Sequence, residues 1–418
     1  MSSASHVAFV GLGYIGLPTA VVMANSGLKV TGIDVNAANV EKINRGEVTI
    51  IEPGLEDELK KALDSGRFSA STEQVHADAY IIAVPTPFTD GHAVDMKYIY
   101  SAAEAIAPQL EGNELVVLES TSPPLTTQKM AQRILELRPD LRADKDGTDP
   151  TDKTVYFAHC PERILPGKAM EELRTNDRII GGQTSEATRR ASEIYASFCE
   201  GELLPTNDVT AEMAKLTENS FRDVNIAFAN ELSLIADNLN INVWELIELA
   251  NHHPRVNILQ PGPGVGGHCI AVDPWFIVSS DPENSKLIGT ARRINDDKPE
   301  WVIDKVVEAI GKSEGTRLAI LGLAFKPDID DLRESPALEI AKRISTQFED
   351  TQIDVVEPNI QSLPDSLSGF DNVELKPLEQ AVESADVVLL LVDHRQFKEF
   401  DAEKLKTKTV IDTKGLWQ

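Results

Sequence analysis

The chain has 418 residues, of which 42% are hydrophobic and 26% charged, as in an ordinary soluble globular protein of two or three domains. Its formal net charge is −27 and no dense Lys/Arg cluster occurs, which argues against a nucleic-acid partner because such binding requires neutralising phosphates. Cys160, Cys199 and Cys269 form no CxxC pair, so we expect neither a disulfide framework nor a metal site.

The N-terminal residues predict a dinucleotide-binding turn. Residues 6–16, HVAFVGLGYIG, form an apolar strand followed by a Gly-x-Gly-x-x-Gly turn, and a helix and a second strand come next. In this setting the glycines let the backbone approach a pyrophosphate at the helix N-terminus. Asp34 ends the second strand, where a carboxylate binds the adenosine ribose and repels a 2′-phosphate, which favours NAD over NADP. A loop of small residues without a ligand is the alternative.

The apolar segments favour a cytoplasmic protein without a membrane partner. The first residues, MSSASHVAFVGLGYIG, lack a basic leader, and their apolar run continues into the glycine turn as a first strand would. The longest apolar runs, such as VVLLLV at 387–392, are too short to span a bilayer.

Polar side chains follow several predicted strands. VPTP (84–87) and ESTSPP (119–124) each end an apolar strand, and AHCPERILPG (158–167) follows the strand TVYFA. Because carboxyl ends of parallel strands form the ligand edge of an open α/β sheet, we expect these loops to converge there. Glu162 taken alone would more simply be a surface charge. The polar segment 138–154 predicts an exposed loop.

A long helix is predicted for 210–241, which lacks Pro and Gly and is rich in helix formers. It is apolar on more than one side, as a helix packed between domains or against another subunit would be. Lys215, Asn219 and Arg222 are spaced i, i+4 and i+7 and so share a face, where they could stabilise a developing alkoxide and a nearby anion. A solvated polar stripe is the alternative.

Cys269 follows a crowd of glycines in GPGVGGHCIAVDPW (262–275). Glycine permits close approach of another group, which a thiol that meets a substrate requires. A buried small hydrophobic residue is the alternative, and metal ligation with His268 is disfavoured because no second ligand pair is found. Asp273 would lie close to Cys269 if a helical turn follows.

The C-terminal part repeats the N-terminal plan. RLAILGLAFKP (317–327) parallels 6–16, and ADVVLLLVD (385–393) and KTVIDTKG (408–415) parallel ADAYIIAVP (77–85) and NELVVLEST (113–121). Continuous apolar strands indicate parallel sheets buried on both faces. We therefore expect an α/β fold with two Rossmann-like domains, 1–205 and 301–418, joined by a central helical region, 206–300. The second turn lacks the last glycine and contains Lys326, which predicts a phosphorylated ligand bound in a different manner from the first.

In combination these stretches resemble the UDP-glucose/GDP-mannose dehydrogenase family from end to end. The segments that carry the resemblance are GLGYIGLPTA, AVPTPF, ESTSPP, CPERILPG, AEMAKLTENSFRDVNIAFANELS, NHHPRVNILQPGPGVGGHCIAVDPWF and GLAFKPDIDDLRESPA. The resemblance implies an NAD domain, a central dimerisation region and a domain that binds the nucleotide of a UDP-sugar. Within the family, CPERILPG and NHHPRVN are most similar to members that oxidise the N-acetyl-D-mannosamine sugar, with the UDP-glucose and UDP-N-acetylglucosamine enzymes as alternatives.

The resemblance also assigns roles to individual residues. The residues implied in catalysis are the nucleophile Cys269 with Lys215, Asn219, Asp273, Glu162 and Thr121. Those implied in NAD binding are Gly11, Gly13, Tyr14, Ile15, Gly16, Asp34, Asn39, Pro85, Thr86, Thr121 and Arg333. Those implied in UDP-sugar binding are Arg163, Ile164, Lys215, Asn219, Arg222, His253, Arg255, Gly266, Phe325 and Lys326. Arg255 would reach the partner subunit's site in a homodimer, and Asn39 stands where some members have an arginine.

The implied reaction oxidises the sugar C6 alcohol to a carboxylate through two hydride transfers, with a thiohemiacetal and then a thioester on Cys269. Lys215 and Asn219 would stabilise the oxyanions, and Glu162 would manage the hydrolytic water. Two rival interpretations are a non-catalytic NAD-sensing module and a two-electron hydroxyacid dehydrogenase that needs no thiol. Counting the NADH formed per sugar separates all three.

Overall fold

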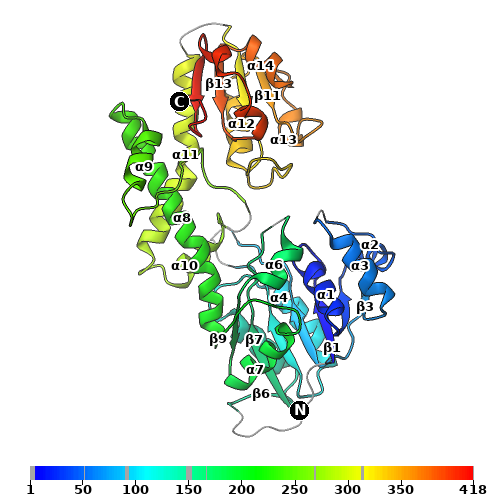
Figure 1. The fold of residues 1–418 in the computed structure, drawn as a ribbon. Helices are drawn as coiled ribbons and strands as arrows, with labels where there is room; N and C mark the ends of the chain where they lie inside the picture. Colours follow the sequence, from blue (N-terminus) through cyan, green and yellow to red (C-terminus); the bar gives the residue numbers. More distant parts are fainter. Residues whose placement is uncertain are drawn as a thin grey trace. The chain divides into compact units, whose positions relative to one another are not determined.

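The computed structural model describes residues 5–50, 52–89, 94–146, 153–165, 167–267, 270–311 and 315–417. The chain divides into two compact units, 1–218 and 219–418, which Figure 1 colours from blue to green and from green to red. The boundary falls within one long helix, α8, which runs from Asp208 to Asn238.

The first unit is built on a doubly wound sheet. The described strands take the order β3-β2-β1-β4-β5-β7-β8-β9, and β6 pairs with β7. All pairs are parallel except β7 with β8. The strands are β1 His6–Val10, β2 Lys29–Ile33, β3 Phe68–Ser71, β4 Ala79–Ile82, β5 Leu115–Leu118, β6 Arg142–Ala143, β7 Thr154–His159, β8 Arg178–Gly182 and β9 Leu203–Asn207.

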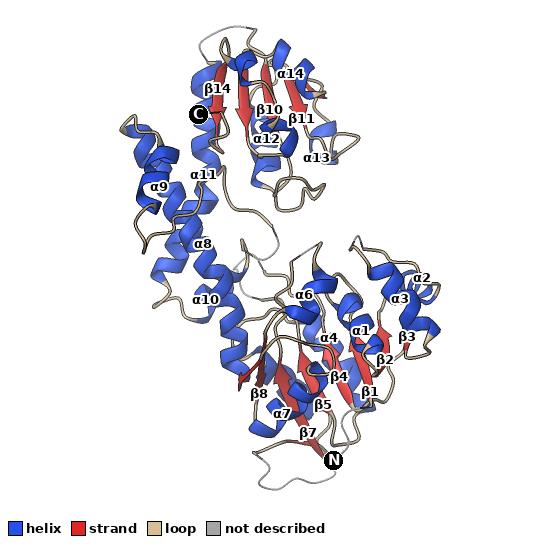
Figure 2. Ribbon diagram, in the orientation of Figure 1, coloured by secondary structure: helices blue, strands red, loops and turns tan. Residues whose placement is uncertain are grey.

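Helices cover both faces of this sheet (Figure 2). Alternate residues of β1 explain why: Val7 and Phe9 pack into one buried cluster with α1, α3 and α7, whereas Ala8 and Val10 pack into another with α4 and α5. Strands buried on both sides read as continuous apolar runs, as observed. The helices are α1 Gly16–Asn25, α2 Ala37–Asn44, α3 Leu55–Asp64, α4 Lys97–Ile106, the short η1 Ala107–Gln109, α5 Thr126–Leu137, α6 Ala169–Thr175 and α7 Ser185–Tyr195.

The second unit contains a parallel sheet in the order β12-β11-β10-β13-β14. Its two faces are again buried, one by α11, α12 and α13 and the other by α14 and α15. The strands are β10 Leu318–Leu321, β11 Ile353–Val356, β12 Val373–Leu375, β13 Val387–Leu390 and β14 Thr409–Asp412. The helices are α9 Val243–Asn251, α10 Asp273–Ser280, α11 Lys286–Ile310, α12 Pro336–Gln347, α13 Asp365–Ser368, α14 Leu378–Ser384, α15 Arg395–Lys398 and η2 Ala402–Leu405.

The predicted fold class, two Rossmann-like α/β sheets with a central helical region, is confirmed, and the predicted long helix is α8. One local expectation was wrong in part: the segment 138–154, expected as a loop, contains the two-residue strand β6, because Arg142 and Asp144 donate backbone hydrogen bonds to Lys153 and Val155. Residues 147–152 of this segment lie outside the described residues. No helix in the described ranges is both long and apolar enough to cross a bilayer.

A buried ion pair joins α8 to α11 within the second unit. The Arg292 guanidinium bonds the Asp223 carboxylate, and both side chains have no exposed surface. Asn295 donates to Asp223 over 2.8 Å and accepts from Asn230 over the same distance. Burying two charges is costly, so the pair persists only because neighbouring hydrogen bonds and mutual attraction compensate.

Removing one member of this pair should therefore be severe. We expect Arg292→Met to lower the free energy of unfolding by about 3–5 kcal/mol, since it leaves the Asp223 carboxylate buried and unpaired. Arg343→Met is the matched control, because Arg343 pairs with Glu300 at the surface and should change stability by at most about 1 kcal/mol. Urea unfolding of both variants measures the difference, and equal losses would contradict the assignment.

Candidate active site

The glycine turn lies at the carboxyl end of β1 and has the geometry of a ligand cradle. Gly11 has φ +98°, and a Cβ there would lie 2.2 Å from the Ala83 carbonyl oxygen, so only glycine fits. A Cβ on Gly13, in contrast, would meet nothing within 4 Å, so protein packing leaves the space over this residue open. Such space at the start of α1 suits a pyrophosphate.

Asp34 stands at the end of β2, as expected. One carboxylate oxygen accepts from the Leu12 backbone N–H over 3.0 Å and the other from the Asn36 N–H over 2.8 Å. Asn39 lies in the first turn of α2, and its side-chain oxygen accepts from Thr49 over 2.9 Å. The backbone thus orients the Asp34 carboxylate before any ligand arrives.

Glu52 is a residue of this region that the sequence did not single out. Its buried carboxylate accepts from the Tyr14 hydroxyl over 2.6 Å and from the backbone of Gly167 and Ala169 over 2.9 and 2.7 Å. Burial and the bond to Glu52 raise the pKa of Tyr14 to about 12. Glu52 therefore connects Tyr14 of the glycine turn to the segment that follows Ile164. Ile15 and Gly16 are the next residues of that turn.

The loops after β4 and β5 also meet at this edge. The Thr86 hydroxyl donates to the Thr121 carbonyl over 2.7 Å, and the Val84 N–H, next to Pro85, donates to Ser120 over 2.9 Å. These contacts join the loop after β4, residues 84–87, to the loop after β5, residues 119–124. They support the expectation that several loops converge at one edge.

Glu212, at the start of α8, holds the end of the loop after β5. Its carboxylate is fully buried and accepts from the backbone of Leu125 and Thr127 and from the Thr127 hydroxyl, over 2.6 to 2.7 Å. Burial raises the pKa of Glu212 to about 7, although the Thr127 and Leu125 donors favour the charged form. The helix that carries Lys215 is thereby fixed to the loop that carries Thr121.

Glu162 and Arg163 lie after β7, as expected, but Glu162 is not a surface charge. Only 8% of Glu162 is exposed, and it bonds the backbone of Arg163 and Ile164 and the buried guanidinium of Arg178. Arg163 pairs with Glu218 on α8 over 3.0 Å. No sequence motif predicted a role for Arg178, because its partners follow separate strands.

The second unit orders another set of predicted residues. The Asn219 amide donates to the Asp273 carboxylate over 2.5 Å, and Asp273 begins α10. Arg222 is exposed on α8, and after α9 the Arg255 N–H donates to the exposed His253 ring over 3.3 Å. Cys269 and the neighbouring His268 lie outside the described residues.

The glycines before Cys269 are explained by a close approach inside the second unit. A Cβ on Gly266 would lie 2.3 Å from the Glu334 carbonyl oxygen and 3.2 Å from Phe325 Cβ. The Gly267 N–H donates to the same Glu334 carbonyl over 3.2 Å. The loop that carries Phe325 and the exposed Lys326 therefore packs directly against the segment leading to Cys269.

Arg333 is on that loop, pairs with Asp331 over 2.7 Å, and has a side chain that is 71% exposed. It belongs to the second unit, whereas the other residues expected to bind NAD belong to the first. Its role in cofactor binding therefore stays a prediction.

In the C-terminal sheet, Glu357 takes the place that Asp34 has in the first sheet, but it is also hydrogen-bonded by His394. The Gly322 backbone has φ +93°, and the next two N–H groups, of Leu323 and Ala324, donate to Glu357 over 2.8 and 3.1 Å. His394 donates through Nε2 to Glu357 over 3.0 Å, since its Nδ1 accepts from the Asp328 N–H. Burial raises the pKa of Glu357, but the bonds from His394 and the backbone outweigh burial and lower it.

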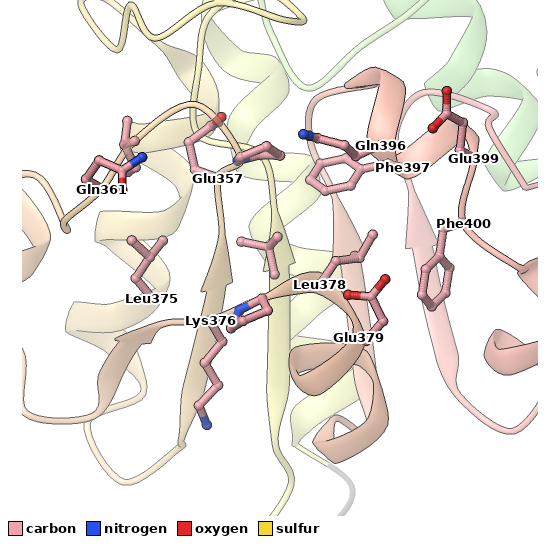
Figure 3. A pocket seen from close by; sticks show the side chains of 14 residues that line it. Glu357, Gln361, Leu375, Lys376, Leu378, Glu379, Gln396, Phe397, Glu399 and Phe400 are labelled. Carbon is pink, nitrogen blue, oxygen red and sulfur yellow. The ribbon is translucent and has the colours of Figure 1, made fainter.

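A cavity of about 660 Å³ lies beside Glu357, at the carboxyl ends of β11 and β12. Figure 3 shows Glu357, Gln361, Lys376 and Phe400 around it. None of the described residues expected to bind the UDP-sugar lines this cavity.

Comparison with known proteins agrees with this architecture. Residues 5–199, 209–297 and 319–418 match, in turn, the NAD binding, central and UDP binding domains of the UDP-glucose/GDP-mannose dehydrogenase family. The chain belongs to this family.

Within the UDP-glucose/GDP-mannose dehydrogenase family, relatives match over nearly the whole chain. A UDP-N-acetyl-D-mannosamine dehydrogenase of Yersinia pestis is 54% identical over 99% of this chain and 99% of its own length. An NDP-N-acetyl-D-galactosaminuronic acid dehydrogenase of Ralstonia nicotianae is 52% identical over 98% of this chain and 96% of its own. A solved UDP-N-acetyl-mannosamine dehydrogenase from Staphylococcus aureus has a TM-score of 0.84 and 41% identity, covering 99% of this chain and 95% of that one.

The packing of Gly266 predicts a sharp steric effect. Gly266→Ala should destabilise the protein by about 1–3 kcal/mol and reduce turnover, because the new methyl group meets the Glu334 backbone and displaces the segment before Cys269. Gly369→Ala is the control, since a Cβ there meets nothing within 4 Å. Thermal unfolding and steady-state rates of both variants check this, and an unchanged Gly266→Ala enzyme would contradict it.

Proposed function

We propose that this protein is an NAD-dependent dehydrogenase that oxidises the C6 alcohol of UDP-N-acetyl-D-mannosamine to the carboxylate. Family membership and the 54% identical relative support the reaction and the sugar. The structural observation that carries the proposal is the Asn219–Asp273 hydrogen bond, which ties α8 to the start of α10, four residues after Cys269. The Ralstonia relative favours an N-acetylgalactosamine sugar as the second candidate.

The first unit has the features that NAD requires. Gly13 leaves room for the pyrophosphate, and Asp34 presents an oriented carboxylate for the ribose. Tyr14, Ile15, Gly16, Asn39, Pro85, Thr86 and Thr121 would complete the site, with Arg333 from the second unit. When bound, NAD supplies the hydride acceptor for both oxidations.

The substrate side would be shared among several segments. Arg163, Ile164, Arg222, His253, Gly266, Phe325 and Lys326 would hold the UDP-sugar. We retain the division into an NAD domain (1–205), a central region (206–300) and a UDP-sugar domain (301–418) as part of this proposal.

The chain's own residues account for the chemistry. A base or a water activated by it removes the hydroxyl proton, and the Cys269 thiolate adds to the resulting aldehyde. Lys215 and Asn219 stabilise the alkoxide, with Asp273 orienting the Asn219 amide. After the second oxidation water adds to the thioester, the C–S bond breaks, and the carboxylate and the Cys269 thiol are released with one proton. Glu162 orients this water, and Thr121 assists.

Self-association is the second part of the proposal. Phe221, Phe228 and Ile235 recur every seven residues on α8, so they share a face, and they are 71%, 51% and 49% exposed. Such an apolar stripe is suited to a second copy of this chain. The exposed Arg255 would then serve the partner subunit's site.

The substrate proposal makes a quantitative prediction. Purified protein should form two NADH per UDP-N-acetyl-D-mannosamine and should turn over this sugar far faster than UDP-glucose, UDP-N-acetylglucosamine or UDP-N-acetylgalactosamine at equal low concentration. One NADH per sugar would indicate a simple alcohol dehydrogenase, and none would indicate an NAD-sensing module. Faster turnover of another sugar would overturn the choice of N-acetylmannosamine.

Cys269→Ala separates the two oxidations. Given the UDP-sugar aldehyde and NAD, the wild type should produce NADH and the uronate, whereas the variant should produce almost none because no thiohemiacetal can form. The same variant should still reduce the aldehyde with NADH, which shows that the hydride site is intact. Wild-type aldehyde oxidation by Cys269→Ala would instead support oxidation of the aldehyde hydrate.

The dimer has its own test. Phe228→Glu should shift the protein to a monomer in analytical ultracentrifugation and reduce activity sharply, because a charge is placed within the apolar stripe. Leu287→Glu is the control, since Leu287 is 70% exposed on α11 outside the stripe and should leave the sedimentation unchanged. A wild-type protein that sediments as a monomer would contradict the proposal.

A further inference from the structure

A buried charge cluster lies directly behind Glu162 in the first unit. The Arg178 Nη2 donates to Glu162 Oε2 over 2.7 Å, and its Nη1 lies 3.7 Å from Glu119 Oε1. The three side chains are 4%, 7% and 0% exposed. One guanidinium is thus shared by two carboxylates from the ends of different strands.

Among the described residues, Tyr195, Phe198 and Cys160 contact this cluster. Tyr195 on α7 donates its hydroxyl to Glu119 over 3.1 Å, and its ring, like that of Phe198, lies 5.1 Å from the guanidinium. The Cys160 thiol lies 4.0 Å from Arg178 Nη1, and burial raises the pKa of Cys160 to about 12. Neither Tyr195 nor Cys160 brings a charge near neutral pH, so the balance rests on the two carboxylates and the arginine.

The single positive charge of Arg178 compensates one ionised carboxylate, so ionising both glutamates would leave one buried negative charge uncompensated. Burial, together with the charge of Glu162, raises the pKa of Glu119 to about 8. Glu162 has more hydrogen-bond donors, since two backbone N–H groups and Arg178 all donate to its carboxylate. Near neutral pH the proton of the pair therefore resides on Glu119.

We propose that Arg178 and Glu119 are positioning residues that hold the Glu162 carboxylate in the orientation needed for the reaction. Arg178 orients Glu162 directly through its hydrogen bond, and Glu119 controls the strength of that bond because it contacts the same guanidinium. The inference rests on the proposed role of Glu162 in orienting the hydrolytic water. A protonated Glu119 leaves the guanidinium to Glu162. An ionised Glu119 competes for the same guanidinium and loosens the Glu162 carboxylate.

The pH dependence of kcat in Glu119→Gln tests the proposed role of Glu119. Glutamine keeps the shape of the protonated acid but cannot ionise, so the variant should lack the alkaline loss of kcat that Glu119 causes in the wild type. The ratio of variant to wild-type kcat should rise by about tenfold between pH 7 and pH 9, as expected for a single group with a pKa near 8. A ratio that stays constant over this range would overturn the role of Glu119.

The pH dependence of the free energy of unfolding tests the titration of Glu119 independently of kcat. An acid whose pKa is raised on folding binds its proton more tightly in the native state, so stability is lost as pH rises from the unfolded value towards about 8. The wild type should therefore lose stability relative to Glu119→Gln between pH 5 and pH 8 in urea unfolding. Parallel curves would contradict a raised Glu119 pKa.

Arg178→Lys tests the shared guanidinium. Lysine keeps the charge but cannot bond two carboxylates in a fork, so kcat should fall at least about tenfold while KM for the UDP-sugar changes less than about twofold. The same substitution in a Glu162→Gln background should cost little, because the group that Arg178 positions is already changed. Intact-protein mass spectrometry should show the sugar thioester accumulating on Cys269 in both single variants. Arg189→Lys, at an exposed ion pair on α7, should change none of these quantities.

Additive losses in the Arg178→Lys/Glu162→Gln pair, or a lower kcat without the trapped thioester, would show that Arg178 only supports the fold. If Arg178→Lys does not fold, Glu119→Gln still decides the proposal through its pH ratio. A wild type that forms no second NADH would refute the proposed function itself, which is a separate outcome from an active wild type whose variants behave additively.

Discussion

Buried carboxylates that accept backbone N–H groups hold the loops of both units in place. Glu52, Glu162 and Glu212 do so in the first unit, and Glu357 does so in the second. Each of these bonds is charge-assisted and lies in surroundings with little water, so it is stronger and more directional than an exposed one. They hold loops at the carboxyl ends of strands, where the candidate site residues lie.

These carboxylates also join parts of the chain that are distant in sequence. Glu52 connects the glycine turn to the segment after Ile164, and Glu212 connects α8 to the loop of Thr121. Each carboxylate thus couples two such parts through hydrogen bonds of 2.6 to 2.9 Å. Such coupling suits an enzyme that must align a cofactor and a substrate, since small misplacements of reacting groups are costly in rate.

The two Rossmann-like sheets show how one local plan serves two purposes. Asp34 and Glu357 both end a second strand and both bond the N–H that follows a positive-φ glycine. Asp34 is left half-buried, whereas Glu357 is buried and accepts a further hydrogen bond from His394. The second sheet therefore keeps the backbone geometry of the first turn, with an acid that His394 also bonds.

The sequence by itself determined the α/β class, the glycine turn, the place of Asp34 at the end of a strand, and the long helix. It could do so because these features depend on local periodicity, on backbone conformations that only glycine adopts, and on motifs contiguous along the chain. Only the tertiary structure decided which partners the buried side chains have. Arg178 meets Glu119 and Glu162 because β5, β7 and β8 are neighbours in the sheet, and His394 meets Glu357 across two strand ends. Such contacts depend on the order of strands in the sheet, which cannot be predicted from any single segment of the sequence.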